Sequence, residues 1–236
     1  MMPVDPGGLW ASIERLEKSR ASGGVEPPEL LQQVVIAADE LFLMSGTGLM
    51  LMDAGGTLRY VTASNEPVRH LESAQEEVGE GPCIDSYVQD VVVMTPDVCV
   101  DERWPRLAPL LAPHGICAVL GAPVSLGGSA VGTLNLYRDR PHDWDDSEAG
   151  AIQAYCRTVE AILATVVAAE QRGRLADQLQ YALDYRVLIE RGIGYLMAQH
   201  GIDSVAAFDR LRNAARSSRR KVGDVAKDVL DGRGLD

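Results

Sequence analysis

The chain is organised around its residues 182–230, which read ALDYRVLIERGIGYLMAQHGIDSVAAFDRLRNAARSSRRKVGDVAKDVL. Apolar side chains recur there mostly three or four positions apart, which predicts helices with one apolar face each. Gly201 followed by Asp203 is typical of a helix end and a new helix start, and Ser217 or Ser218 is the expected start of a third helix. The stretch therefore predicts three short helices that close a small core.

The same stretch is the basic part of an acidic chain. The whole sequence has 22 Lys and Arg against 34 Asp and Glu, a net charge of −12. Residues 182–236 hold ten basic against eight acidic side chains, whereas the remainder holds 12 against 26. No acid lies between Arg210 and Gly223. Such a basic corner indicates a local phosphate-binding surface, with a solvated helix face as the alternative.

Three segments of this stretch resemble the helices of an ANTAR domain. The matching residues are Ala182, Leu183, Arg186, Ile189, Glu190, Gly194, Leu196 and Met197, then Ala206, Ala207, Phe208, Leu211, Arg212 and Ala215, then Ser217 to Val222 and Asp224 to Ala226. The resemblance implies a three-helix RNA-binding module of bacterial transcription antiterminators. Such modules act as dimers on paired hairpin loops in nascent transcripts. Where the family usually has Ala-Lys-Gly, this chain has Gly192-Ile193-Gly194.

The resemblance and the charge together predict which side chains contact RNA. Loops expose bases and phosphates that a duplex hides, so a cluster of cations at one corner suits them. Two alternatives stay open: a helix-turn-helix regulator that binds DNA, and a protein-contacting sensor in which Ile193 marks lost RNA contact. The expected RNA-binding residues are Arg212, Arg216, Arg219, Arg220 and Lys221.

Composition sets the class of the remaining chain. Hydrophobic residues make up 46% and aromatic residues 5%, so aliphatic packing is expected to dominate the cores. We see no apolar run near the roughly 20 residues of a membrane span and no signal peptide. The four cysteines are scattered without a CxxC pair, which favours reduced thiols in a cytoplasmic protein. The histidines form no ligand pair with them, so no metal site is expected.

Residues 29–169 alternate between helical and strand patterns, which predicts an α+β domain with an antiparallel sheet. A short helix over 9–18 is expected to fray, and 19–28 to be a linker. The predicted helices are 29–44, 66–78 and a long one that starts with a capping box of Asp145 and Glu148, and 103–114 is a helix or turn segment. The predicted strands are 49–53, 58–63, 91–95, 117–125 and 131–138, with hairpin turns expected at 53–56 and 126–129.

Four motifs in this region resemble a GAF domain, and more narrowly the GAF domains joined to ANTAR domains in actinobacterial regulators. They are Val78-Gly-Glu-Gly-Pro-Cys83, Asp101-Glu-Arg-Trp-Pro105, Gly121-Ala-Pro-Val124 and Gly132-Thr-Leu-Asn-Leu-Tyr137. The resemblance implies a six-stranded sheet with helices on both faces and a sensory role. The expected division is 1–28 N-terminal helix and linker, 29–169 GAF domain, 170–181 connecting helix and 182–232 ANTAR domain.

The motifs name no ligand and no catalytic residue. The cyclic-nucleotide GAF pattern and a Cys-His pair for bilin attachment are absent, as are a P-loop and a Ser-centred elbow. Cys83 has two interpretations, a thiol sensor or a small buried residue in a turn, of which we favour the second. We therefore expect a non-enzymatic sensor of an unspecified small ligand or redox signal.

The joint between the domains has helical composition without proline from Asp146 to Gln199, and a continuous helix would span about 80 Å. A first apolar stripe ends near Val166, and a second includes Leu179 and Leu183. Two stripes on one helix favour a homodimeric coiled coil with a bend at Gly173, and packing on the chain's own sheet is the alternative. In this hypothesis the GAF domain sets the geometry of two ANTAR modules.

Overall fold

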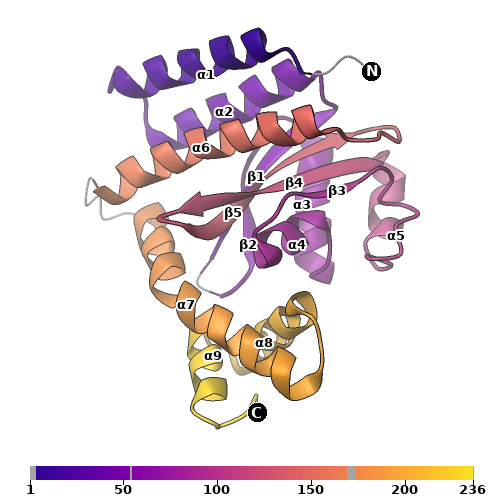
Figure 1. The fold of residues 1–236 in the computed structure, drawn as a ribbon, viewed down its shortest axis with the longest axis vertical. Helices are drawn as coiled ribbons and strands as arrows, with labels where there is room; N and C mark the ends of the chain where they lie inside the picture. Colours follow the sequence, from indigo (N-terminus) through magenta and orange to yellow (C-terminus); the bar gives the residue numbers. More distant parts are fainter. Residues whose placement is uncertain (1–3, 54, 169–173, 236) are drawn as a thin grey trace.

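The computed structural model describes residues 4–53, 55–168 and 174–235. One antiparallel sheet has the strand order β2-β1-β5-β4-β3 (Figure 1). The described residues contain five strands, as the strand pattern predicts, whereas the family resemblance implied six. The segment from Pro96 to Cys117 contains four prolines and forms turns and short helical pieces. The strands are β1 Gly46–Met52, β2 Leu58–Ala63, β3 Val93–Thr95, β4 Ala118–Leu126 and β5 Ser129–Arg138.

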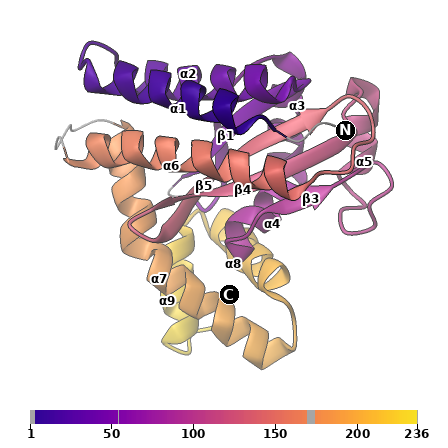
Figure 2. The ribbon, with the colours of Figure 1, turned by 45° about the horizontal axis from the view of Figure 1, so that its top comes forward.

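Helices cover both faces of this sheet, which confirms the predicted α+β class. One layer consists of α1 Pro6–Ala21, α2 Pro27–Phe42 and α6 Asp146–Ala168 (Figures 1 and 2). The opposite layer consists of α3 Glu66–Val78, α4 Pro82–Gln89 and α5 Ala108–Leu111, followed by the 3-10 turn Ala112–His114. Three further helices lie beyond the second layer: α7 Arg174–His200, α8 Ser204–Ser218 and α9 Val222–Leu230.

Local sequence chemistry explains the two predicted hairpins. The Asp53 carboxylate accepts hydrogen bonds from the backbone N–H groups of Gly55 at 2.8 Å and Thr57 at 3.0 Å, which closes the β1–β2 turn. Gly127 and Gly128 have φ values of 60° and 82° between β4 and β5. A two-residue hairpin turn with positive φ at both positions favours glycine, so this pair determines the turn.

Helix α6 is the central helix of the first layer. At its start Asp145 accepts from the N–H of Glu148 at 3.0 Å while Glu148 Oε2 accepts from the N–H of Asp145 at 3.0 Å, which confirms the predicted capping box. By length and composition α6 is apolar enough to cross a membrane, with a mean hydropathy of 1.3. Half of that apolar stretch is buried, and its buried face packs in the core over the sheet.

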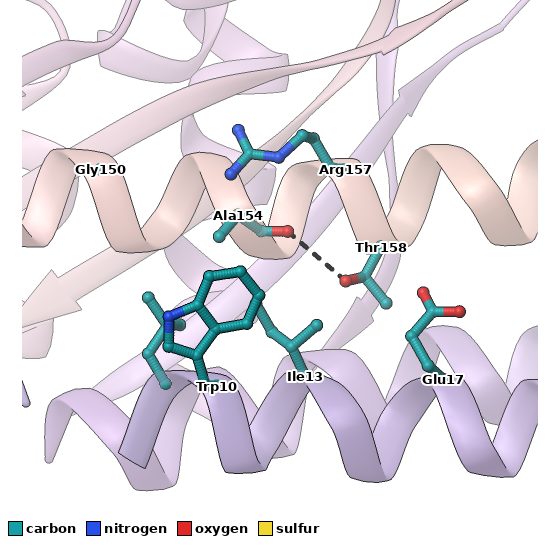
Figure 3. A pocket seen from close by; sticks show the side chains of 8 residues that line it. Trp10, Ile13, Glu17, Gly150, Ala154, Arg157 and Thr158 are labelled. Atoms are coloured by element: carbon teal, nitrogen blue, oxygen red, sulfur yellow. Dashed lines mark hydrogen bonds between the residues drawn. The ribbon is translucent and has the colours of Figure 1, made fainter. Parts of the chain in front are cut away.

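Helix α1 is longer than predicted and is docked rather than frayed. Asp5 caps its first turn, and Leu16 is buried in the core of the first layer. The Tyr155 hydroxyl of α6 donates a 2.7 Å hydrogen bond to Ser12. Figure 3 shows the outer side of this contact, where Trp10 and Ile13 of α1 lie opposite α6. Tertiary contacts with α2 and α6 thus order a segment whose own pattern is weak.

The predicted long helix is two helices. Helix α6 ends at Ala168, and α7 begins at Arg174 and runs in a different direction (Figure 1). The expected bend at Gly173 lies outside the described residues. The described members of both apolar stripes, such as Val159 on α6 and Leu179 on α7, lie in the same buried core as the sheet. The alternative of packing on the chain's own sheet therefore describes these stripes, and neither is available here for a partner helix.

Candidate nucleic-acid interface

Three consecutive exposed cations of the C-terminal module lie in the turn between α8 and α9. Helix α8 continues to Ser218, so the prediction that Ser217 or Ser218 begins the third helix was wrong; Lys221 precedes α9 instead. Arg219 ends α8 in a left-handed conformation with φ 54°, and the N–H of Arg220 donates to the Ala215 carbonyl at 2.9 Å. This backbone turn displays three consecutive basic side chains, all of them exposed.

The three side chains of this basic turn, Arg219 to Lys221, differ in the partners that they contact. Arg220 pairs with Asp228 of α9 at 2.5 Å, and this hydrogen bond holds the pKa of Asp228 below its usual value. The Lys221 ammonium lies 4.7 Å from the centre of the Tyr181 ring on α7. Arg219 makes no ion pair with any residue that the structure describes. Exposed pairs of this kind contribute little stability, so phosphate can compete for the basic turn.

Arg212 has the opposite environment. It is 2% exposed, and its Nη2 donates to Asp209 at 2.6 Å while Nε has no hydrogen-bond partner among the described residues. Burial lowers the pKa of this guanidinium. Gly79, in a left-handed conformation with φ 73°, lies so close that a Cβ there would overlap the Arg212 guanidinium. In this arrangement Arg212 faces α3 and α4, not solvent.

Arg216 is exposed but also reaches toward the first domain. Its Nη2 lies 3.3 Å from Thr57 Oγ1 in the β1–β2 turn and 3.4 Å from the Glu76 carbonyl oxygen at the end of α3. Both are long hydrogen bonds to neutral acceptors, so they hold the Arg216 side chain in place only weakly. The structure therefore divides the five predicted residues: the basic turn faces outward, Arg212 is buried, and Arg216 lies at the edge of the contact.

Sequence reasoning missed a sixth cation, Arg186, and the helix it contacts. Arg186 on α7 is 4% exposed, pairs with Glu190 at 2.6 Å, and lies 4.8 Å from the centre of the Tyr87 ring on α4. The ring of Phe208 on α8 lies 5.9 Å from the same Tyr87 ring, centre to centre. The sequence indicates a turn at Gly81-Pro82, where the structure has the start of α4. Proline at the first helical position after a glycine was the available signal for that helix.

Around these contacts the two halves of the chain share one apolar core. Helix α8 lies beside α4 in Figures 1 and 2, and side chains from the sheet, α4 and α7–α9 are buried together. Each Å² of apolar surface buried in this shared core contributes roughly 25 cal/mol, so the core stabilises the contact between the two halves. We call this contact the docked interface. Its members include Met50, Met52, Leu58, Ile84, Tyr87, Ile189, Phe208, Leu211, Val222 and Val225.

In the unusual Gly192-Ile193-Gly194 segment the first two residues are buried, whereas Gly194 is exposed. Ile193 is 8% exposed and packs in the shared core. A Cβ on Gly192 would approach Ala226 Cβ to 3.0 Å, so the glycine lets α7 and α9 come close together. The segment thus has a packing role, whatever contacts it makes with RNA.

A polar cluster fills the space between the sheet and α3. Asn135 Nδ2 of β5 donates to Glu72 Oε1 at 2.9 Å, and Gln75 Nε2 lies 2.9 Å from Cys83 Sγ. Burial raises the pKa of Glu72 to about 8 and raises that of the Cys83 thiol. A thiolate is the reactive form of cysteine, so this environment supports the small-buried-residue interpretation of Cys83 and not the thiol sensor.

The histidine, cysteine and carboxylate side chains of the described residues do not form a metal site. No group of three or more His, Cys, Asp or Glu side chains is placed to hold an ion there. His70 and His114 stack with ring centres 4.0 Å apart at the surface.

Comparison with known domain families gives two matches along the chain. Residues 26–163 match the GAF domain, and residues 177–230 match the ANTAR domain. No curated protein sequence matches the chain. The narrower likeness to actinobacterial regulators has no support from these matches.

Solved structures match the first of these two regions. A domain of a two-component sensor histidine kinase from Sinorhizobium meliloti is 24% identical, with 61% of this chain and 95% of that chain covered and a TM-score of 0.53. The GAF domain of a phosphoenolpyruvate-protein phosphotransferase from Coxiella burnetii is 16% identical over 69% and 96%, with a TM-score of 0.54. Free methionine-R-sulfoxide reductase from Neisseria meningitidis is 13% identical over 72% and 97%, with a TM-score of 0.56. These likenesses show the fold, which occurs in a sensor kinase, a phosphotransferase and a reductase and therefore does not by itself indicate one activity.

Proposed function

This chain belongs to the GAF family and carries an RNA-binding ANTAR antitermination domain behind its sensory GAF domain, and on that premise we propose that the GAF domain controls whether the ANTAR domain reaches RNA. The observation that carries the proposal is the docked interface. Arg212 is an expected RNA contact, yet it is buried against Gly79 of the GAF domain. Docking and full RNA contact therefore exclude each other at this side chain.

The basic turn is the surface that RNA meets first. Arg219, Arg220 and Lys221 are exposed in the docked arrangement, and Arg216 lies at its edge. We propose that these four residues contact phosphates and looped-out bases, and that Arg212 joins them once α8 leaves α4. The ligand or signal that drives release is not specified by the GAF interior, in which Cys83 is buried and the thiol pKa is raised.

The proposal includes a homodimer in the cytoplasm. Because both apolar stripes of α6 and α7 lie against the chain's own core, the dimer contact has to form elsewhere. Release from α4 would expose the apolar face that contains Phe208. An exposed apolar patch of this kind favours association with a second copy. The alternatives, duplex DNA as the polymer or a protein as the partner, are outcomes of the binding experiment.

The test compares a triple variant, Arg219→Ala, Arg220→Ala and Lys221→Ala, with the wild type on hairpin RNA across a series of salt concentrations. We expect weaker binding and a salt dependence flatter by about 0.7 log unit for each phosphate that the variant no longer neutralises. The matched control removes three cations from α1: Arg15→Ala, Lys18→Ala and Arg20→Ala. An unchanged slope excludes the basic turn from the interface, and tighter binding of duplex DNA than of hairpin RNA at matched salt contradicts the RNA proposal.

A further inference from the structure

A cleft of about 550 Å³ opens between the two domains, beside the docked interface. Its walls come from α4, from the loop that contains Arg103 and Arg106, and from the first turn of α8. This volume is in the range of small-molecule sites. Residues from both domains line it, so anything bound there contacts both.

The charged side chains of the cleft leave an excess of negative charge. Arg106 is paired with Glu80, its Nε lying 2.8 Å from Oε2. Arg103 is paired with Asp101 at 2.7 Å and stacks 4.2 Å from the Trp104 ring centre. Both arginines thus have carboxylate partners within the GAF domain, and the charge of Arg103 also acts on Asp85.

Asp85 is the carboxylate without a full set of partners. It is 8% exposed and lines the cleft, where its Oδ2 accepts from Trp104 Nε1 at 3.1 Å. Its Oδ1 is buried and has no hydrogen-bond donor among the described residues. Three charged side chains in the walls of the same cleft also shift the pKa of Asp85: Arg103 lowers it, and Asp203 and Glu80 raise it. Buried acceptors nearly always have a donor, so an ordered water or a ligand in the cleft is the expected source of this one.

Asp203 faces Asp85 from the ANTAR side. It caps α8, with Oδ1 accepting from the N–H of Ala206 at 2.8 Å, and it is exposed at the mouth of the cleft. Its charge raises the pKa of Asp85, although burial is the larger cause and brings that pKa to about 6. At neutral pH Asp85 is therefore mostly ionised. The negative charge of Asp203 destabilises this ionised form.

We propose that this cleft binds a small organic cation with N–H donors, an amine or a guanidinium, held between Asp85 of the GAF domain and Asp203 of the ANTAR domain. The described residues form no three-ligand metal group, which favours an organic cation over a metal ion. A cation there supplies the donor that Asp85 Oδ1 lacks and screens the repulsion between the two carboxylates. It also joins α4 to α8 and so stabilises the docked arrangement. The binding site stands on its own; only its effect on RNA rests on the proposed function.

The test is calorimetric titration of the full chain with butane-1,4-diamine, and with butane-1,4-diol as the neutral compound of matched length. We expect the diamine to bind and the diol not to bind. Asp85→Asn keeps an acceptor for Trp104, and we expect it to weaken diamine binding at least tenfold. Asp203→Asn keeps a helix cap and is expected to weaken binding less, because that side chain is exposed.

Asp90→Asn is the matched control, because Asp90 ends α4 but does not line the cleft. It is expected to bind diamine as the wild type does, and circular dichroism checks that each variant is folded. Absence of diamine binding, equal binding of the diol, or equal affinity of wild type and Asp85→Asn overturns the proposal.

A separate measurement addresses regulation. Diamine is expected to weaken hairpin RNA binding by the wild type, with Asp85→Asn at the same diamine concentration correcting for diamine that binds RNA directly. Diamine binding without any change in RNA affinity supports the site and contradicts the docking control, so the two failures are distinguishable.

Discussion

Arg212 lies within α8 and Arg219, seven residues later, lies just past its end, and the two have opposite surroundings. Arg212 is 2% exposed, paired with Asp209 and pressed against the GAF domain, whereas Arg219 is exposed and makes no ion pair with a described residue. Both belong to the same charged cluster in the sequence. The difference teaches that a basic cluster has an inner and an outer side, and that only the outer side is immediately available to RNA.

The largest expected effect concerns the buried carboxyl beneath the docked interface. Glu72 has its pKa raised to about 8 by burial, so the folded protein holds this proton more tightly than the unfolded chain. Its contribution to stability is therefore intact below a pH of about 4.5 and is lost as pH rises through about 8. Glu72→Gln mimics the protonated form and is expected to be several kcal/mol more stable than wild type at pH about 9. Over the intervening range the stability of the wild type is expected to fall by at most about 1.4 kcal/mol per pH unit relative to the variant.

Urea unfolding at a series of pH values measures this difference. Glu77→Gln, on the exposed side of the same helix, is the control and is expected to leave the pH dependence unchanged. The orphan atoms agree with a protonated Glu72: Oε2 and Asn135 Oδ1 both lack partners among the described residues, and a proton on the first supplies a donor for the second. Parallel pH profiles for wild type and Glu72→Gln would show that this carboxyl is ionised in the folded protein.

The second effect compares the two arginines directly. Arg212→Ala removes a buried guanidinium that pairs with the partly exposed Asp209, and is expected to lower the free energy of unfolding by about 2 kcal/mol. Arg219→Ala changes a surface residue and is expected to stay within about 0.5 kcal/mol of wild type. Hairpin RNA binding should show the reverse order in the docked protein, with the larger loss for Arg219→Ala. Equal stability losses in denaturant titrations would contradict the inner and outer assignment.

The smallest effect isolates docking with two glycines. Gly79 and Gly115 have similar φ values of 73° and 65°, but only a Cβ at Gly79 meets Arg212; nothing lies within 4 Å of one at Gly115. Alanine at either position strains the backbone by about 1 kcal/mol. Gly79→Ala is expected in addition to displace the Arg212 side chain, loosen docking and raise RNA affinity.

Small-angle scattering and RNA titration together check this expectation. The Gly79→Ala variant should have a larger radius of gyration and tighter hairpin binding than Gly115→Ala. If the two variants have the same radius and the same RNA affinity, the contact between Gly79 and Arg212 does not hold the domains together.

Some of the candidate site was readable from the helical period. Arg212 lies four residues after Phe208 and three before Ala215, both of which are buried, so it falls on the apolar face of α8. Because helical residues three and four apart share a face, that spacing by itself indicates an inward-facing arginine. The place of Arg219 to Lys221 in a turn between helices was not predicted, because the sequence prediction began the third helix at Ser217 or Ser218. The contact of Arg186 with Tyr87 was not readable, because the partner belongs to another domain.

The sequence by itself determined the local structure: the hairpins with Gly127-Gly128 and Asp53, the capping box of α6, the apolar faces of α7 to α9, and the motifs of both domains. These features depend on backbone preferences and on residues a few positions apart, which a linear pattern records. Only the tertiary structure decided that α1 is docked and that the two apolar stripes face the chain's own sheet. It also decided that Arg212 is buried against Gly79 at the end of α3 and Arg186 beside Tyr87 of α4. Such outcomes depend on which apolar surfaces meet, and the surface that buries a residue lies about a hundred positions away or more in this chain.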